Sequence, residues 1–262
     1  MIRIFHDAGH GGKDPGATGN GLKEKDLTLK LSQYFGEILR TEYSNVIEKA
    51  SRVDDRFLNL ATRSNMANEW GGADYIISFH VNSANGKARG FESFIYNGST
   101  PNTTENYRTI IHDEIMKVNN LFDRGKKKAN FHMVRETRMD AVLTENGFID
   151  NSHDAHLLKD NDYLYEVAKA HARGIAKIFS LNPKGKPEPS TGNKKYEVIG
   201  GTFSSKENAL RQAEKVRKVG VESYVKKRGD YYEVIVGTFT HYEGAKTRSR
   251  HIEDKGIETY IK

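Results

Sequence analysis

The sequence predicts an α/β domain with a mixed central sheet flanked by helices, followed by a small α+β domain of βαββαβ order. Two observations predict this division. Strand-like and helical apolar patterns alternate up to residue 181, which is typical of an α/β sheet. An internal repeat occupies the C-terminal part, after a segment that holds three of the five prolines. We therefore expect domains at 1–181 and 195–262, joined by a linker at 182–194.

The elements of the first domain follow from the spacing of its apolar residues. Short apolar or alternating runs predict strands, and apolar stripes at helical spacing predict helices. In chain order we expect a strand at Ile2–Phe5, a helix at Glu24–Leu39, a strand at Asn45–Ala50, a helix at Phe57–Trp70, strands at Asp74–Val81 and Gly90–Tyr96, a helix near 106–120, strands near Phe131–Arg135 and Ala141–Glu145, and a helix near Tyr163–Phe179.

The second domain contains a repeat of two units. YEVIGGTF at Tyr196–Phe203 recurs as YEVIVGTF at Tyr232–Phe239, an offset of 36 residues, and ESYVK at 222–226 recurs as ETYIK at 258–262 with the same offset. Helices are expected between the strands at Ser205–Val219 and Tyr242–Lys255. Two units are too few for a solenoid and predict one compact split-βαβ sheet.

Composition narrows the classes of function. The chain has no cysteine, which excludes disulfides, thiolate metal sites and cysteine nucleophiles, so any metal must be held by His, Asp or Glu. No stretch approaches the roughly 20 apolar residues of a membrane span, and we see no signal peptide. Of the net charge of +6, the segment 194–262 carries +5, from 15 basic and 10 acidic residues. This segment is the better candidate for binding an anionic polymer.

IFHDAGHGG at Ile4–Gly12 places His6 and His10 four residues apart. Such a pair shares one face only in a helix. The three glycines around His10 favour a loop instead, because glycine costs about 1 kcal/mol in a helix interior. We expect His6 to be a structural residue of the first strand. His10 then lies beyond the carboxyl end of that strand, at the sheet edge where ligands usually bind.

Three further residues are expected near the same edge. Glu24 begins the first long helix, His80 ends the apolar run IISFH, and Glu145 ends a β-like run before Asn-Gly, a turn signal. Two histidines and one glutamate form a known catalytic zinc set, with a fourth position for water. A second glutamate outside the metal shell could take the proton from that water, as in metal-assisted hydrolysis. The sequence alone does not show that these residues converge.

Six motifs follow one another from residue 1 to 181: DAGHGGKDPGATG, LKEKDLTL, SRVDDRFLNLATRSNMAN, ADYIISFHVNS, GFESFIY and AVLTENGFIDN. Their order resembles that of the zinc-dependent N-acetylmuramoyl-L-alanine amidases, the type 3 amidase domain. The resemblance implies that His10, Glu24 and His80 hold one Zn²⁺ and that Glu145 is the catalytic glutamate, with Asn82 as a substrate contact. It also implies hydrolysis of the amide between the lactyl group of N-acetylmuramic acid and L-alanine of the peptidoglycan stem peptide.

The tail, with its repeat layout and its GTF motifs, resembles the sporulation-related repeat (SPOR) domain. That family is a peptidoglycan-binding module with the βαββαβ plan. The resemblance implies that glycan strands are the ligand of residues 195–262.

The two resemblances imply a monomeric hydrolase that acts on glycan strands and stem peptides at the cell wall, with neither nucleic acid nor a membrane as partner. Lacking a signal peptide, it would be a phage endolysin released through a pore or a bacterial autolysin freed by cell lysis, and the sequence leaves both open. The alternative is a non-catalytic protein that binds the cell wall or nucleic acid through its basic βαββαβ domain. The repeat lacks the Arg/Lys-Gly-Phe type of motif that RNA-binding sheets carry. The intact set of His10, Glu24, His80 and Glu145 argues against a non-catalytic wall-binding protein.

Overall fold

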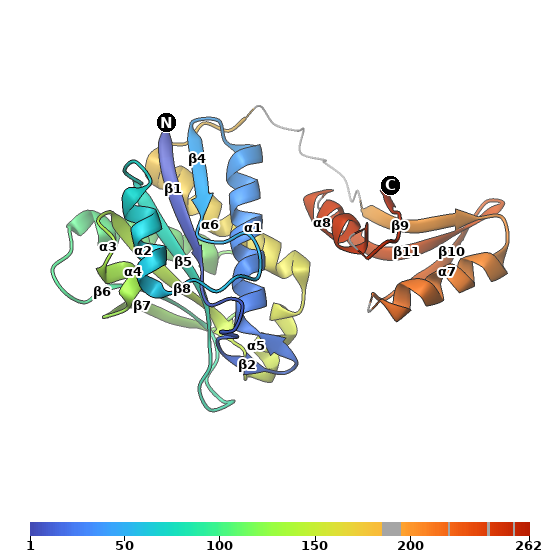
Figure 1. The fold of residues 1–262 in the computed structure, drawn as a ribbon, viewed down its shortest axis with the longest axis horizontal. Helices are drawn as coiled ribbons and strands as arrows, with labels where there is room; N and C mark the ends of the chain where they lie inside the picture. The colour runs from blue at the N-terminus through green and yellow to red at the C-terminus, as the bar shows by residue number, and fades with distance from the viewer. Residues whose placement is uncertain (185–194, 220, 240–241, 254) are drawn as a thin grey trace. The chain divides into compact units, whose positions relative to one another are not determined.

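The computed structural model describes residues 1–184, 195–219, 221–239, 242–253 and 255–262. The chain divides into two compact units, Met1–Lys186 and Pro187–Lys262 (Figure 1). Most of the expected linker, 185–194, lies outside the described residues. Its first residues pair with the first unit, since the Ser44 amide donates to the Asn182 carbonyl at 3.0 Å. Among the described residues, no helix combines the length and apolar character needed to cross a membrane.

The first unit is built on a six-stranded sheet. Its strands are β1 (Ile2–Ala8), β4 (Val46–Ala50), β5 (Tyr75–Asn82), β6 (Phe91–Tyr96), β7 (Asp123–Ala129) and β8 (Asp140–Phe148), and a separate hairpin is formed by β2 (Thr18–Gly19) and β3 (Leu22–Lys23). The strand order is β4-β1-β5-β8-β6-β7. The first four run parallel, whereas β6 is antiparallel to β8 and parallel to β7. The predicted mixed α/β sheet is therefore confirmed.

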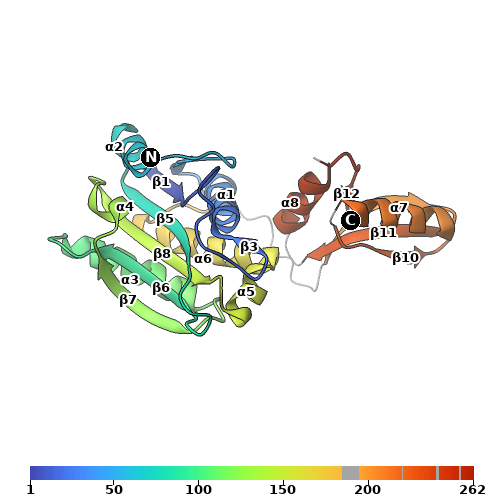
Figure 2. The same ribbon diagram turned by 60° about the horizontal axis from the view of Figure 1, so that its bottom comes forward.

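Helices cover both faces of this sheet, as Figures 1 and 2 show. They are α1 (Glu24–Glu42), α2 (Leu60–Glu69), α3 (Asn102–Met116), α4 (His132–Arg135), α5 (Ser152–Leu158) and α6 (Asn161–Phe179). The larger core lies under α1, α3 and α6, where Phe35 and Ile175 pack in one cluster with Phe79 of β5. The smaller core lies under α2 and α4, where Ala67 and Met133 pack with residues of the opposite face of the sheet.

The prediction of a strand at Phe131–Arg135 is wrong, because these residues form the short helix α4. Met133 and Val134 are adjacent in sequence, yet both are buried in the smaller core. A strand sends adjacent side chains to opposite faces, whereas a helical turn can direct both toward the sheet. The edge strand in this region is β7, whose sequence DRGKKKA has no apolar pattern to reveal it. Its lysines are typical of an edge strand protected from pairing with other chains.

The strand around Glu145 is longer than expected. β8 continues through Asn146 and Gly147 to Phe148, so the Asn-Gly pair is not a turn. β8 pairs with β5 on one side and with β6 on the other, and Asn146 lies opposite Phe91. Pairing on both sides overrides the local turn preference. Glu145 therefore lies within a central strand, with neighbours on both flanking strands.

The second unit has the predicted βαββαβ order. Its elements are β9 (Tyr196–Phe203), α7 (Lys206–Lys218), β10 (Tyr224–Arg228), β11 (Tyr231–Phe239), α8 (Tyr242–Glu253) and β12 (Tyr260–Ile261). The sheet is antiparallel, in the order β10-β11-β9-β12. Ala213 of α7 and Ile252 of α8 share one hydrophobic cluster with Val198 and Val234 of the sheet, so this unit has its own core.

His6 is a buried residue of β1 with structural partners. Its Nδ1 atom lies 2.7 Å from Ser32 Oγ and its Nε2 atom 2.5 Å from Glu48 Oε2. Its ring packs edge-on against Phe35 at 5.3 Å between centroids. Burial alone would raise the pKa of Glu48, but the hydrogen bond from His6 and the charge of Arg40 outweigh it and lower the pKa to about 2. His6 thus joins β1 to α1 and β4.

We expect His6→Ala to lower the free energy of unfolding by about 2–4 kcal/mol, because it removes a packed ring and leaves Ser32 and Glu48 without this partner. Urea denaturation at neutral pH measures the change. The part that comes from Glu48 is present above its unfolded-state pKa and is lost as the pH falls toward about 2. The control Arg40→Ala removes an exposed partner of Glu48 and should cost less than about 1 kcal/mol. Wild-type stability in His6→Ala would contradict the structural role.

Candidate active site

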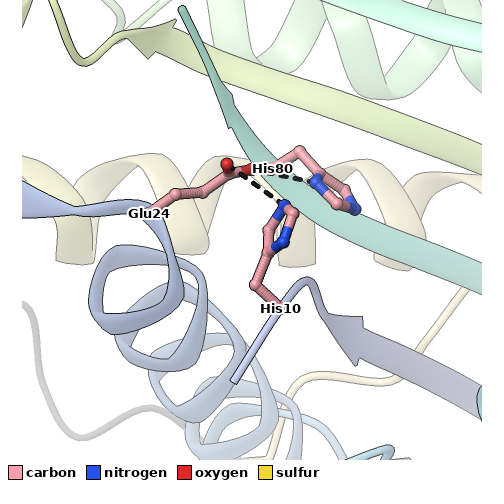
Figure 3. A group of neighbouring side chains, drawn as sticks. All are labelled: His10, Glu24 and His80. Atoms are coloured by element: carbon pink, nitrogen blue, oxygen red, sulfur yellow. Dashed lines mark hydrogen bonds and ion pairs between the residues drawn. The ribbon is translucent and has the colours of Figure 1, made fainter. Parts of the chain in front are cut away.

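Three side chains from separate elements meet at one edge of the larger sheet (Figure 3). His10 lies on the loop after β1, Glu24 is the first residue of α1, and His80 lies near the end of β5. His10 Nε2 is 3.1 Å from Glu24 Oε2, and His80 Nδ1 is 2.9 Å from Glu24 Oε1. One donor atom from each residue lies within 4.8 Å of the others. Two imidazoles and one carboxylate are a donor set suited to zinc, so this histidine cluster could hold such an ion.

Glu24 is the centre of the histidine cluster. Its side chain is buried, and its two oxygens also accept hydrogen bonds from the backbone amides of Ala17, at 2.8 Å, and Val81, at 3.0 Å. Burial alone would raise the pKa of Glu24. The hydrogen bonds and charges of His10 and His80 outweigh it and hold this pKa well below its usual range. The carboxyl of Glu24 is therefore ionised at any pH near neutrality.

The backbone of His10 is held in an uncommon conformation, with φ of 62°. Arg63 donates to the His10 carbonyl at 2.5 Å, and Arg52 donates to the Gly9 carbonyl at 2.8 Å. Asp14 Oδ2 lies 2.9 Å from His10 Nδ1 and orients the ring. Burial alone would lower the pKa of His10, but the hydrogen bonds to Glu24 and Asp14 outweigh it and raise this pKa. The loop is thus fixed by contacts on both of its sides.

Two glycines leave room for the histidine cluster. A Cβ atom on Gly9 would lie 2.4 Å from Cε1 of the His80 ring. A Cβ atom on Gly16 would lie 2.6 Å from Glu24 Oε2 and 2.7 Å from Cδ2 of the His10 ring. Any larger residue at either position would have to displace a side chain of the cluster, because real Cβ atoms do not approach other heavy atoms this closely.

Glu145 lies beside the histidine cluster on the same face of the sheet. In the strand register, it is opposite His80 of β5 on one side and opposite Glu92 of β6 on the other. Its Oε2 atom is buried and, among the described residues, has no hydrogen-bond partner. Burial, and then the negative charges of Glu24 and Glu92, raise the pKa of Glu145 well above its usual value. A carboxyl group in this state has the proton affinity of a general base or acid.

A pocket of about 410 Å³ opens beside the histidine cluster, on the side of β1. Its wall includes both histidine rings, His10 and His80. The segment before and into α2 contributes Phe57, Leu58 and Leu60 to the same wall. The phenyl ring of Phe57 and the side chain of Leu60 are exposed, which leaves apolar surface open to a ligand.

The structure brings all four residues singled out from the sequence, His10, Glu24, His80 and Glu145, to one edge of one sheet. Neither His80 nor Glu145 ends its strand, since β5 continues to Asn82 and β8 to Phe148.

Other residues of the site could not be found from the sequence. Asp14 orients His10 across a loop, and the charge of buried Arg63 is balanced by Asp7, whose Oδ1 atom lies 2.9 Å from it. Glu92 lies in the predicted strand GFESFIY, but a single acidic residue there carries no signal of its contacts. These contacts join segments far apart in sequence, which spacing cannot reveal.

A mixed α/β fold that brings a His–Glu–His cluster and a partly buried carboxyl to the carboxyl-end edge of its sheet has the parts that a metal-assisted hydrolase uses. The sequence profile of the N-acetylmuramoyl-L-alanine amidase family matches residues 4–177, and that of the SPOR domain matches residues 192–262. The chain belongs to the N-acetylmuramoyl-L-alanine amidase family. It is a peptidoglycan hydrolase that cleaves the amide between N-acetylmuramic acid and L-alanine, as its sequence predicted.

Several proteins are similar in sequence to this chain over most of its length. It is 44% identical to the N-acetylmuramoyl-L-alanine amidase CwlM of Bacillus licheniformis, over 86% of this chain and 85% of the relative. It is 45% identical to a sporulation-specific N-acetylmuramoyl-L-alanine amidase of Bacillus subtilis, over 86% and 84%. It is 41% identical to an endolysin of Bacillus phage SPP1, over 75% of each.

The solved structures include the catalytic domain of CwlV, an N-acetylmuramoyl-L-alanine amidase from Bacillus (Paenibacillus) polymyxa var. colistinus. It is 31% identical to this chain with a TM-score of 0.65, and the similarity covers 70% of this chain and 100% of that domain.

We expect Gly9→Ala to lower kcat/KM for peptidoglycan about a hundredfold, because the new methyl group displaces the His80 ring and small misplacements in a site have effects of this size. Release of L-alanine amines from purified peptidoglycan measures the rate. The control is Gly71→Ala, at φ 64° with no neighbour within 4 Å of the new Cβ. It should lower the melting temperature slightly and leave kcat/KM unchanged. Equal rates for the two variants would show that Gly9 is not needed for the position of His80.

Proposed function

We propose that the chain is a zinc-dependent amidase in which His10, Glu24 and His80 hold one zinc ion and Glu145 is the catalytic carboxyl. The observation that carries this proposal is the meeting of three ligand atoms within 4.8 Å, with Glu145 in register beside His80. The donor set matches the one that catalytic zinc sites use, with a further position for water.

A bound zinc ion would polarise the scissile carbonyl and lower the pKa of water at the site. Glu145 takes the proton of the attacking water, for which its buried Oε2 atom and raised pKa suit it. It then gives that proton to the departing amine of L-alanine. The Oε2 atom is buried and has no hydrogen-bond partner among the described residues, so no neighbouring side chain competes for the proton at this atom.

Other residues position the groups that take part in this reaction. Arg63 and Arg52 keep the loop that carries His10 against the sheet. Asn82 has its side-chain amide oriented by Glu92 at 2.7 Å, which supports the substrate contact expected from the sequence. Preorganised groups of this kind need not be reordered during the reaction.

We also propose that the tail binds glycan strands and that the protein works as a monomer at the cell wall. In this proposal, residues 1–181 form the catalytic domain, 182–194 the linker and 195–262 the domain that binds the cell wall. Support comes from tyrosines on the small sheet, since Tyr224 and Tyr260 flank Ile235 and Ile199 in one cross-strand row. Both tyrosines are about half-exposed, and exposed aromatic rings suit sugar stacking. The relatives include a sporulation-specific amidase and an endolysin, so this protein could act either as a bacterial autolysin or as a phage endolysin.

We expect Glu145→Gln to abolish hydrolysis while leaving the fold and zinc binding intact, because the amide keeps the shape of the side chain and cannot accept the proton. Calorimetry of zinc binding and the release of L-alanine amines measure the two properties. The control Glu24→Gln should lose zinc affinity as well as activity, since it weakens a ligand. Near-normal hydrolysis by Glu145→Gln would remove Glu145 from the mechanism.

The metal and the bond that is cleaved are tested together on purified peptidoglycan. We expect one zinc ion per chain, new L-alanine amines only when metal is present, and recovery of activity when zinc is restored after chelation. Elemental analysis and end-group labelling give these quantities. New reducing sugar ends would indicate a glycosidase, and full activity in excess chelator would disprove zinc dependence.

A further inference from the structure

A cationic cluster lies beside the active site, on β6 and β7. It consists of Glu92, Arg124 and Lys127. Arg124 Nε donates to Glu92 Oε2 at 3.0 Å, and Lys127 Nζ donates to the same oxygen. Burial alone would raise the pKa of Glu92, but Lys127 and Arg124 outweigh it and lower this pKa. One buried carboxylate therefore holds two cations, and the cluster has a net positive charge.

Both cations also reach solvent. The side chain of Arg124 is 30% exposed and that of Lys127 is 37% exposed. The neighbouring Lys126 points to the other face of the sheet, where its Nζ atom lies 2.6 Å from Asp113 Oδ1 of α3. The pairing register of β6 with β7 shifts between Asp123 and Lys126, which interrupts the strict alternation of β7. Arg124 and Lys127 therefore both contact Glu92 on the face that carries the active site, and Lys126 does not.

The order of the strands suggests which part of the substrate lies over which strands of the sheet. The histidine cluster lies on the β1 and β5 side of β8, and the cationic cluster lies on the β6 and β7 side. In the proposed mechanism, Glu145 of β8 protonates the amine of L-alanine as it leaves. A stem peptide that leaves this amine on the side away from the histidine cluster would extend toward β6 and β7. The pocket lined by Phe57 lies on the opposite side, where it can take the muramoyl group.

We propose that Arg124 and Lys127 bind a carboxylate of the stem peptide, namely the free α-carboxylate of its second residue, a D-glutamate linked through its γ-carboxyl. This inference rests on the proposed function. Two extended residues span about 7 Å, and β7 lies roughly 10 Å from β8, two strand spacings away. The long side chains of Arg124 and Lys127 extend from β7 to Glu92 of β6, and they therefore span the part of the distance between β7 and β8 that the two peptide residues leave. Guanidinium and ammonium groups form strong, charge-assisted hydrogen bonds with carboxylates.

The test uses two muramoyl tripeptides, MurNAc-L-Ala-γ-D-Glu-L-Lys, with the α-carboxyl of D-glutamate either free or amidated. We expect the wild-type protein with zinc to favour the free acid in kcat/KM by about tenfold, the factor that one charge-assisted hydrogen bond typically provides. Arg124→Gln and Lys127→Gln should each bring this ratio toward one. The ratio cancels any loss of folded protein, because both peptides meet the same preparation. The control Lys126→Gln should keep the wild-type ratio.

Equal cleavage of both peptides by the wild type, or an unchanged ratio in both variants, overturns the inference and leaves the proposed function intact. No cleavage of either peptide overturns the proposed function and the inference with it. A third peptide with meso-diaminopimelate in place of L-lysine adds a carboxylate at the third residue. If this carboxylate raises kcat/KM in the wild type alone, while amidation of D-glutamate has no effect, the choice of the second residue is wrong.

Discussion

The candidate active site of the larger unit depends on one buried carboxylate, that of Glu24. A buried charge is stable only when it is paired and hydrogen-bonded, and Glu24 meets this need through His10, His80 and two backbone amides. These partners come from the segment between β1 and β2, which carries His10 and Ala17, and from the strand β5. The same contacts that satisfy the carboxylate therefore bring the two histidines together.

Two buried arginines fix the backbone of the loop that carries His10. Arg52 and Arg63 donate to carbonyl groups of residues 8–10, and Arg63 is also paired with Asp7. A loop whose carbonyls are all held by fixed donors cannot relax easily, which explains how His10 keeps a positive φ. The histidine is held in a strained backbone because the surrounding hydrogen bonds determine its position.

The order of the strands in the larger sheet sets the order in which the chemical groups of the site follow one another across one face. From β1 to β7, one face carries the histidine cluster, then Glu145, then the cationic cluster of Glu92, Arg124 and Lys127. The antiparallel β6 brings its amino end, with Glu92, to the same edge as the carboxyl ends of the parallel strands. The mixed topology thus supplies a carboxylate and two cations where a fully parallel sheet would place a different strand end.

The sequence by itself determined the fold class and most elements, because apolar periodicity is a local property of the chain. It also singled out His10, Glu24, His80 and Glu145, through their places near strand and helix ends and through the order of motifs, and their chemical roles stay a proposal. Only the tertiary structure decided that α4 replaces an expected strand, that Glu145 lies within β8, and which residues surround it. The contacts of Asp14, Arg63 and Glu92 depend on strand register and on loops that cross between elements. Such contacts join distant segments by packing, so no spacing in the sequence encodes them directly.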